Sequence, residues 1–445
     1  MVHHFDRRPT RTRRVATWVV GALGLLAFLS ADGRQACGQM EYEGEPIRYH
    51  DRAVQDPVAR LQARLDAGDV QLAFDPRHGY LPALLQALQI PASSQMLVFS
   101  KTSLQINRIT PQRPRALYFN DDTYIGWVQS GDVVEISTVD PDQGAIFYTL
   151  DQQAVDRPQL VRDKGQCLSC HASSRTQGVP GHLVRSVYPA TDGQPHFGSG
   201  TFLSDHSSPF QERWGGWYVT GRHGAMRHMG NVCSPSREEA EKLDREAGAN
   251  RESLEGLLSV SPYLQPTSDL VALMVLEHQT QMHNWLTLAN YTARRVAHQD
   301  RVINEALQRE PGYVSDSSRR QIASVGDKVL KYLLFSGEFA LTSPVEGTSA
   351  FAREFAAQGP RDQQGRSLRD LDLQTRMFRY PCSYLVYAPS FERLPDSIRS
   401  YIVDRLLRVL RGEDADPAFQ HLRPEDRASI LAILEDTRPE WFAAR

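Results

Sequence analysis

The 445-residue chain has few cysteines, no excess of basic charge and only one long apolar run. Five cysteines are too few for a scaffold that depends on many disulfides. Because 50 Lys and Arg stand against 53 Asp and Glu, the net charge of −3 gives no reason to expect a nucleic-acid partner. The chain also has no long repeat and no low-complexity segment. These features are typical of a globular protein, and only the N-terminal segment departs from that pattern.

The apolar run lies at that N-terminus and is preceded by basic residues. Residues 1–14 carry five arginines against the single acid Asp6, and residues 15–31 (VATWVVGALGLLAFLSA) carry no charge and end in small residues. This order predicts a signal peptide over 1–31 and an exported, periplasmic protein. The alternative is an uncleaved N-terminal anchor with membrane association, although 17 residues fall short of the ~20 that a spanning helix needs. Cleavage leaves a mature chain with a charge near −7.

Two cysteines and a histidine stand together in the segment Cys167-Leu168-Ser169-Cys170-His171. Thiols three positions apart in one turn can reach both vinyl-derived carbons along one edge of a porphyrin, and the next residue then places its imidazole under the iron. This is the attachment pattern for c-type haem. The alternatives are a redox-active Cys-x-x-Cys pair, for which a thioredoxin-like βαβ setting is missing, and half of a zinc site, which would need a second close ligand pair.

With this motif and the signal peptide, the chain resembles c-type cytochromes. The resemblance implies one haem c bound covalently through Cys167 and Cys170, His171 as the proximal iron ligand, and a redox partner protein. Three further stretches resemble parts of large, single-haem exported bacterial proteins. They are RWGGWYVTGRHGAMRHMGN, LVALMVLEHQTQMHNW and RSLRDLDLQTRMFRYPCSYLVYAPSFERLP. This resemblance implies no catalytic residue. The chain differs from di-haem peroxidases because it has a single Cys-x-x-Cys-His.

A distal iron ligand is expected from the glycine-rich loop at 222–230. Imidazole binds ferric iron more strongly than a thioether, so His228 and His223 rank ahead of Met229 and Met226. The predicted long helix after this loop offers a competing set, namely His278, Met282 and His283. A second metal on that helix is disfavoured, because the two histidines are five residues apart and therefore do not share a face, and HExxH is absent.

The pattern predicts an α+β fold, mainly α-helical, with a small antiparallel β region before and around a cytochrome c-like haem segment. Strands are expected at 96–100, 116–120, 123–128, 132–138, 145–150, 183–189 and 217–220. Helices are expected at 58–66, 81–88, 234–258, 267–295, 319–335, 349–357, 396–410 and 424–436. Residues 32–57 read as a mobile leader.

The organisation expected from these elements has five regions. They are the signal peptide or anchor at 1–31, an N-terminal helix plus β region at 32–150, the haem-binding segment at 151–235, a helical region at 236–345 and a C-terminal helical region at 346–445. Three cysteines outside the haem motif allow one disulfide among Cys37, Cys233 and Cys382.

Electron transfer is the predicted function, with two alternatives. A simple haem carrier needs only ~100 residues, so the additional chain fits either docking surface or a pocket. The alternatives are a haem-dependent oxidoreductase that acts on peroxide or oxygen, and a haem-based sensor or binding module. Polar side chains expected in such a pocket are Arg185, His206, Arg222 and His228.

Overall fold

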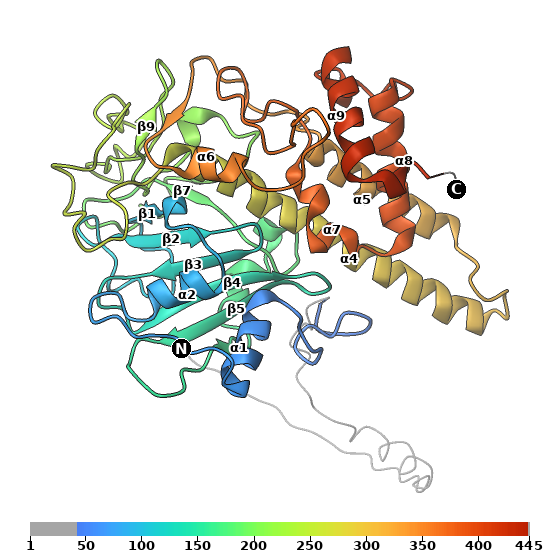
Figure 1. Ribbon diagram of the computed structural model, residues 1–445, viewed down its shortest axis with the longest axis horizontal. Helices are drawn as coiled ribbons and strands as arrows, with labels where there is room; N and C mark the ends of the chain where they lie inside the picture. The colour runs from blue at the N-terminus through green and yellow to red at the C-terminus, as the bar shows by residue number, and fades with distance from the viewer. Residues whose placement is uncertain (1–41, 444–445) are drawn as a thin grey trace, which may run out of the picture. The chain divides into compact units, whose positions relative to one another are not determined.

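A computed structural model describes residues 42–443 and has a mixed α+β architecture (Figure 1). The N-terminal part holds a six-stranded antiparallel sheet in which strands adjacent in sequence pair with one another, so the order is β1-β2-β3-β4-β5-β6. The strands are β1 (Met96–Val98), β2 (Arg115–Phe119), β3 (Thr123–Trp127), β4 (Val133–Asp140), β5 (Gly144–Asp151) and β6 (Val161–Arg162). The five β runs predicted between 96 and 150 each overlap one of the strands β1 to β5, so the meander is confirmed.

The alternation of side chains gives this sheet two different faces. One face carries apolar residues such as Ala116, Tyr118, Ile125 and Ile136, which pack in one core with α1 (Pro57–Ala67) and α2 (Leu81–Ala87). The register of β2 to β5 places Arg115, Glu135 and Ser137 on the other face, together with the apolar Phe147. This second face lies next to the haem motif.

The central element of the structure is α4 (Leu270–Ala306), which is longer than the predicted helix. The carboxylate of Asp269 caps its first turn by accepting from the amides of Val271 and Ala272, at 2.9 and 3.0 Å. Nearly every residue from Leu270 to Leu286 is buried, as expected for a helix surrounded by other elements. In Figure 1 α4 runs from behind the sheet to the C-terminal helices.

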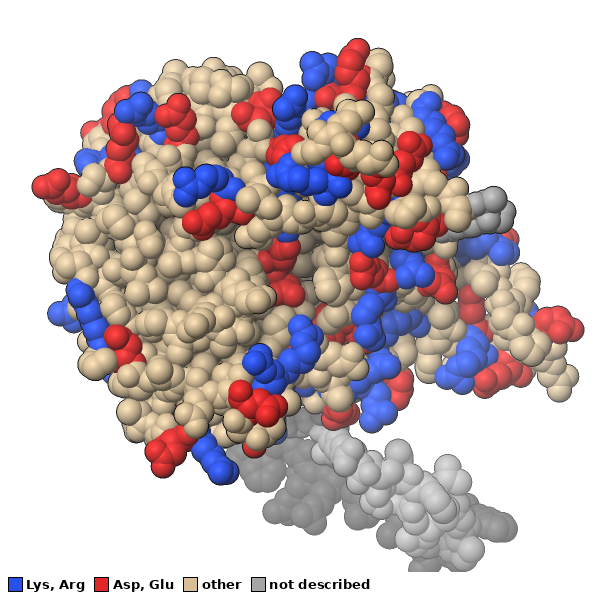
Figure 2. Space-filling view, viewed as in Figure 1, with Lys and Arg blue, Asp and Glu red and all other residues tan. Residues whose placement is uncertain are grey.

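The remaining elements are short helices and two small two-stranded sheets. The helices are α3 (Leu168–His171), α5 (Asp316–Leu333), α6 (Phe351–Ala356), α7 (Pro389–Glu392), α8 (Asp396–Arg411) and α9 (Pro424–Thr437), and the sheets pair β7 (Arg185–Val187) with β8 (Thr201–Leu203) and β9 (Gly221–Arg222) with β10 (Glu346–Gly347). Charged side chains of both signs crowd the face over the C-terminal helices, whereas the face over α2 and the strands carries few (Figure 2).

Three expectations from the sequence are wrong. Residues 234–258 form turns and no helix, because side chains such as Asp244 cap local backbone amides in competition with helix hydrogen bonds. The stretch 217–220 makes only isolated bridges. The described part of the leader is packed, since Tyr42, Ile47 and Tyr49 are buried in the sheet core.

The predicted signal peptide or anchor at 1–31 lies outside the described residues. Within 42–443, none of the helices combines the length and apolar character needed to span a membrane.

Candidate haem-attachment site

The Cys167–His171 motif forms a single helical turn, α3. Two apolar residues in and after this turn are buried, and they fix its position. Leu168 and Ala172 are buried in the sheet core, one turn apart. The carboxylate of Asp163 accepts hydrogen bonds from the amides of Gly165 and Cys167, at 2.9 and 3.0 Å, and so fixes the start of the turn. Between these anchors Ser169 and Cys170 are exposed, whereas His171 is half-buried.

Both thiols of the motif are unpaired, and their environment does not suit a redox-active pair. Cys170 is exposed and Cys167 is half-buried. Burial, together with the carboxylates of Asp163 and Glu135, raises the pKa of the Cys167 thiol to about 12. Redox-active Cys-x-x-Cys sites instead lower the pKa of their attacking thiol. Among the described residues no cluster of three or more His, Cys, Asp or Glu is arranged to hold a metal ion, so the zinc reading gains no support.

His171 is held in one tautomer by a backbone carbonyl. Its Nδ1 lies 2.9 Å from the carbonyl oxygen of Gly181, and since a carbonyl can only accept, Nδ1 carries the proton. Burial lowers the pKa of His171, so the ring is neutral at neutral pH. Nε2 makes no hydrogen bond to any described residue and presents its lone pair, which is the state that binds iron.

The loop from His171 to Gly181 is closed by several local hydrogen bonds. The amide of Gly181 donates to the carbonyl of His171 at 2.8 Å. The hydroxyl of Thr176 lies within 3.2 Å of three carbonyl oxygens, including that of His171. From α4, Asn284 bonds both the amide and the carbonyl of His182, at 2.8 and 2.7 Å. The carbonyl that orients His171 is therefore fixed from two sides.

The polar face of the sheet lies beside His171. The Arg115 guanidinium and the Glu135 carboxylate form a salt bridge with each other, and both influence the pKa of His171. The side-chain amide of Gln105 donates to Glu135 at 3.1 Å. The motif thus has a cation and a carboxylate of the β region near its histidine, and the Gln105 amide holds the carboxylate.

A line of rings leads from His171 into the interior. The ring of Phe147 is centred 4.9 Å from that of His171 and 6.1 Å from that of His182. His182 in turn lies 6.5 Å from His283 of α4. His182 is buried and hydrogen-bonded to Ser137. The line ends at His283, in the wall of a cleft that is also lined by Asp122 and Val139.

The four predicted distal candidates all lie in the protein interior. His223 uses both ring nitrogens, since Nδ1 donates to the Met226 carbonyl and Nε2 accepts from the Asn250 amide. The Nδ1 of His228 accepts from the Gly230 amide, at 3.0 Å. Met226 and Met229 are buried in two different apolar clusters. No hydrogen bond or ring contact among the described residues joins any of the four to the motif, and their role as ligands stays a prediction.

The competing residues on α4 are also occupied. Nδ1 of His278 lies 2.8 Å from Nδ1 of His206, and its Nε2 bonds the Ser383 hydroxyl at 2.8 Å. Met282 is fully buried, and Nε2 of His283 donates to the Asp121 carbonyl at 2.8 Å.

The predicted pocket residues do not gather at one place. Arg185 is half-buried, and its burial lowers the pKa of its guanidinium. His206 is buried against Tyr332, and Arg222 is exposed and paired with Glu252. The residues that do surround the motif, namely Gly181, Asn284, Arg115 and Glu135, were missed. The only signal for any of them is the Gly-Val-Pro-Gly stretch at 178–181, which marks a chain break after the motif.

Comparison with known proteins gave no match, since no family model fits the chain and no curated protein or solved structure is significantly similar to it.

Proposed function

We propose that this chain is an exported c-type cytochrome with one covalently attached haem c, and that it transfers electrons to or from a redox partner protein. Cys167 and Cys170 would form the thioether bonds, and His171 would be the proximal ligand. When bound, haem c supplies a one-electron redox couple. The observation that carries the proposal is the neutral His171 with Nδ1 bonded to a carbonyl and Nε2 free, one turn from two unpaired thiols.

The chain's own residues have defined parts in this proposal. The Gly181 carbonyl orients the imidazole of His171 by accepting a hydrogen bond from its Nδ1–H. This hydrogen bond makes Nε2 a stronger electron donor to a metal. Leu168 and Ala172 hold the helical turn on the sheet core. A distal ligand from 222–230, with His228 and His223 ahead of Met229 and Met226, belongs to the same proposal and requires that loop to release one of its present contacts.

Attachment can be tested by mass spectrometry of the chain expressed with a haem-attachment system. The wild-type protein should gain the mass of one haem, and its N-terminus should begin after about Ala31. The Cys167→Ala/Cys170→Ala double variant should gain none. Cys233→Ala is the matched control and should keep its haem, because Cys233 lies outside the motif. A folded, exported wild-type protein without haem would overturn the proposal.

One observation favours a second candidate, a haem-dependent oxidoreductase. Arg115 and Glu135 place a cation and a carboxylate close enough to His171 to influence its pKa, and such groups suit proton transfer to a bound oxygen species. The ferric spectrum separates the two candidates. A low-spin spectrum that ignores cyanide supports electron transfer, whereas a high-spin spectrum that shifts with cyanide supports peroxide or oxygen chemistry.

A further inference from the structure

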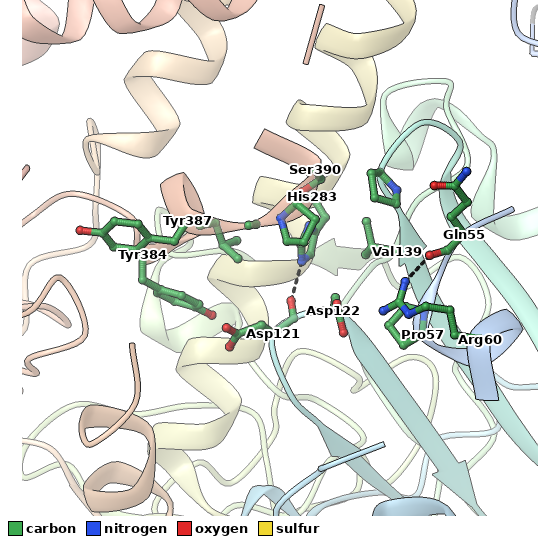
Figure 3. A pocket seen from close by; sticks show the side chains of 14 residues that line it. Gln55, Pro57, Arg60, Asp121, Asp122, Val139, His283, Tyr384, Tyr387 and Ser390 are labelled. Atoms are coloured by element: carbon green, nitrogen blue, oxygen red, sulfur yellow. Dashed lines mark hydrogen bonds between the residues drawn. The ribbon is translucent and has the colours of Figure 1, made fainter. Parts of the chain in front are cut away.

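A cleft of about 170 Å³ lies where α1, the corner between β2 and β3, α4 and residues 384–390 meet (Figure 3). Its walls combine apolar side chains, among them Val139, Leu385 and Pro389, with a polar corner formed by Asp121, Asp122, His283 and Ser390. Arg60 stands at the rim, where its guanidinium donates to the Gln55 carbonyl. None of these residues belongs to the haem motif.

Two buried polar atoms in the wall have no hydrogen-bond partner. They are Nδ1 of His283 and Oγ of Ser390. His283 is only 2% exposed. Because Nε2 of His283 donates to the Asp121 carbonyl, Nδ1 is the unprotonated nitrogen. Burial also lowers the pKa of His283 to about 4, so this ring is neutral at physiological pH. The wall therefore contains a buried acceptor without a partner among the described residues, and such an atom is costly unless a ligand or water satisfies it.

Asp122 is a second acceptor in the same corner. It accepts from the Thr123 hydroxyl at 3.0 Å and forms no salt bridge within the described part of the chain. Its neighbour Asp121 is instead paired with Arg369. Burial raises the pKa of Asp122 to about 6, against an opposing influence of Arg60 at the rim, so the carboxylate is charged above that pH. Unlike Asp121, Asp122 therefore has no positively charged hydrogen-bond donor paired with it among residues 42–443.

We propose that this cleft binds a small primary ammonium compound. An ammonium group has three N–H donors, and the corner offers three matching acceptors, namely Asp122, Nδ1 of His283 and the Ser390 hydroxyl. The apolar wall would cover the attached hydrocarbon. Since one water molecule occupies about 30 Å³, the cleft has room for roughly six groups of that size, which suits an amine with a few carbon atoms. The two aspartates disfavour an anion.

The proposal can be tested by isothermal titration calorimetry of the full mature chain with n-butylammonium chloride at pH 7.5 and constant ionic strength. The wild-type protein should bind one equivalent. Asp122→Asn should weaken binding about ten- to a hundredfold, because it removes the charge and keeps the shape. Ser390→Ala should weaken it about three- to tenfold. Asp132→Asn is the matched control, because Asp132 is exposed and pairs with Arg108, and its affinity should equal that of the wild type.

Two further ligands test whether the charge of the ligand decides its binding. Butanol should bind more weakly than butylammonium, and butyrate should not bind. Butyrate binding more tightly than butylammonium would overturn the proposal and give Arg60 control of ligand charge. Absence of butylammonium binding, or equal binding by Asp122→Asn, would also overturn it. Asp122→Asn should remain folded, since its carboxylate is already disfavoured by burial, and thermal unfolding of the same samples checks this.

Discussion

Asn284 connects the long helix to the segment that orients His171, and its removal has a calculable cost. The residue is 1% exposed, and its side chain bonds both the amide and the carbonyl of His182 at 2.8 and 2.7 Å. Asn284→Ala leaves both backbone groups of His182 buried without partners. Each such group costs about 1–3 kcal/mol, so the free energy of unfolding should fall by about 2–6 kcal/mol.

Urea unfolding followed by circular dichroism measures this loss as a lower midpoint at unchanged slope. Asn290→Ala is the matched control. Asn290 lies on the same helix and is also buried, but its amide reaches the Pro141 carbonyl at only 3.4 Å, so its loss should cost less than about 1 kcal/mol. If the two variants unfold at the same urea concentration, the reasoning about Asn284 is wrong.

The same variant should also change the haem, if the proposed attachment is right. Releasing His182 loosens the Gly181 carbonyl beside it and weakens the hydrogen bond from Nδ1 of His171. The imidazole then donates less electron density to iron, and the reduction potential should rise relative to wild type. A potential equal to that of Asn290→Ala would show that Gly181 is held without Asn284.

Three other predictions follow from the structure. Gly181→Ala would place its Cβ 2.2 Å from Oδ1 of Asn284 and should cost about 1–3 kcal/mol in urea unfolding, whereas Gly126→Ala, which meets no atom nearer than 3.4 Å, should cost less; equal losses would contradict the clash. Burial acts to raise the pKa of Asp426, but hydrogen bonds from Arg423 and Arg376 prevail and lower it to about 2. The stability from this carboxylate is therefore present above about pH 4 and is lost as the pH falls towards 2. In pH-dependent unfolding, Asp426→Asn should no longer show this loss of stability between about pH 4 and 2. The exposed control Asp396→Asn should still show it. Alanine at His223, Met226, His228 and Met229 in turn should convert one variant from low to high spin in the ferric spectrum; if none changes while His278→Ala or Met282→Ala does, the distal ligand comes from α4.

The sequence was informative where the relevant interactions are local. Alternating apolar residues and turn residues predicted the meander from 96 to 150, and the motif at 167–171 predicted a turn with two thiols on one side. The Asp269 cap likewise marked the start of α4. In each case the interacting residues lie within a few positions of one another, so a pattern in the chain reports them.

The sequence was uninformative where contacts join distant segments. Arg115 on β2 and Glu135 on β4 form their salt bridge across the intervening strand β3. Nothing in the sequence of either strand indicates which residue will be its partner. The cleft joins Asp122, His283 and Ser390 from three separate parts of the chain. The loop at 222–230 was predicted to supply a distal iron ligand, and nothing in its sequence indicated that its histidines are buried and hydrogen-bonded within the protein. Composition describes such a loop, but only packing decides which side chains face inwards.

The closure of the segment from Asp163 to Gly181 has a consequence for the order of events during biogenesis. The bonds that shape the turn and select the His171 tautomer all join residues within this short stretch, and closing a short loop loses little chain entropy. We therefore expect the segment to adopt its ligand geometry early, while α4 and the C-terminal helices are still unfolded. If the chain carries the proposed haem, an attachment enzyme could act on the thiols of this segment before Asn284 packs against His182.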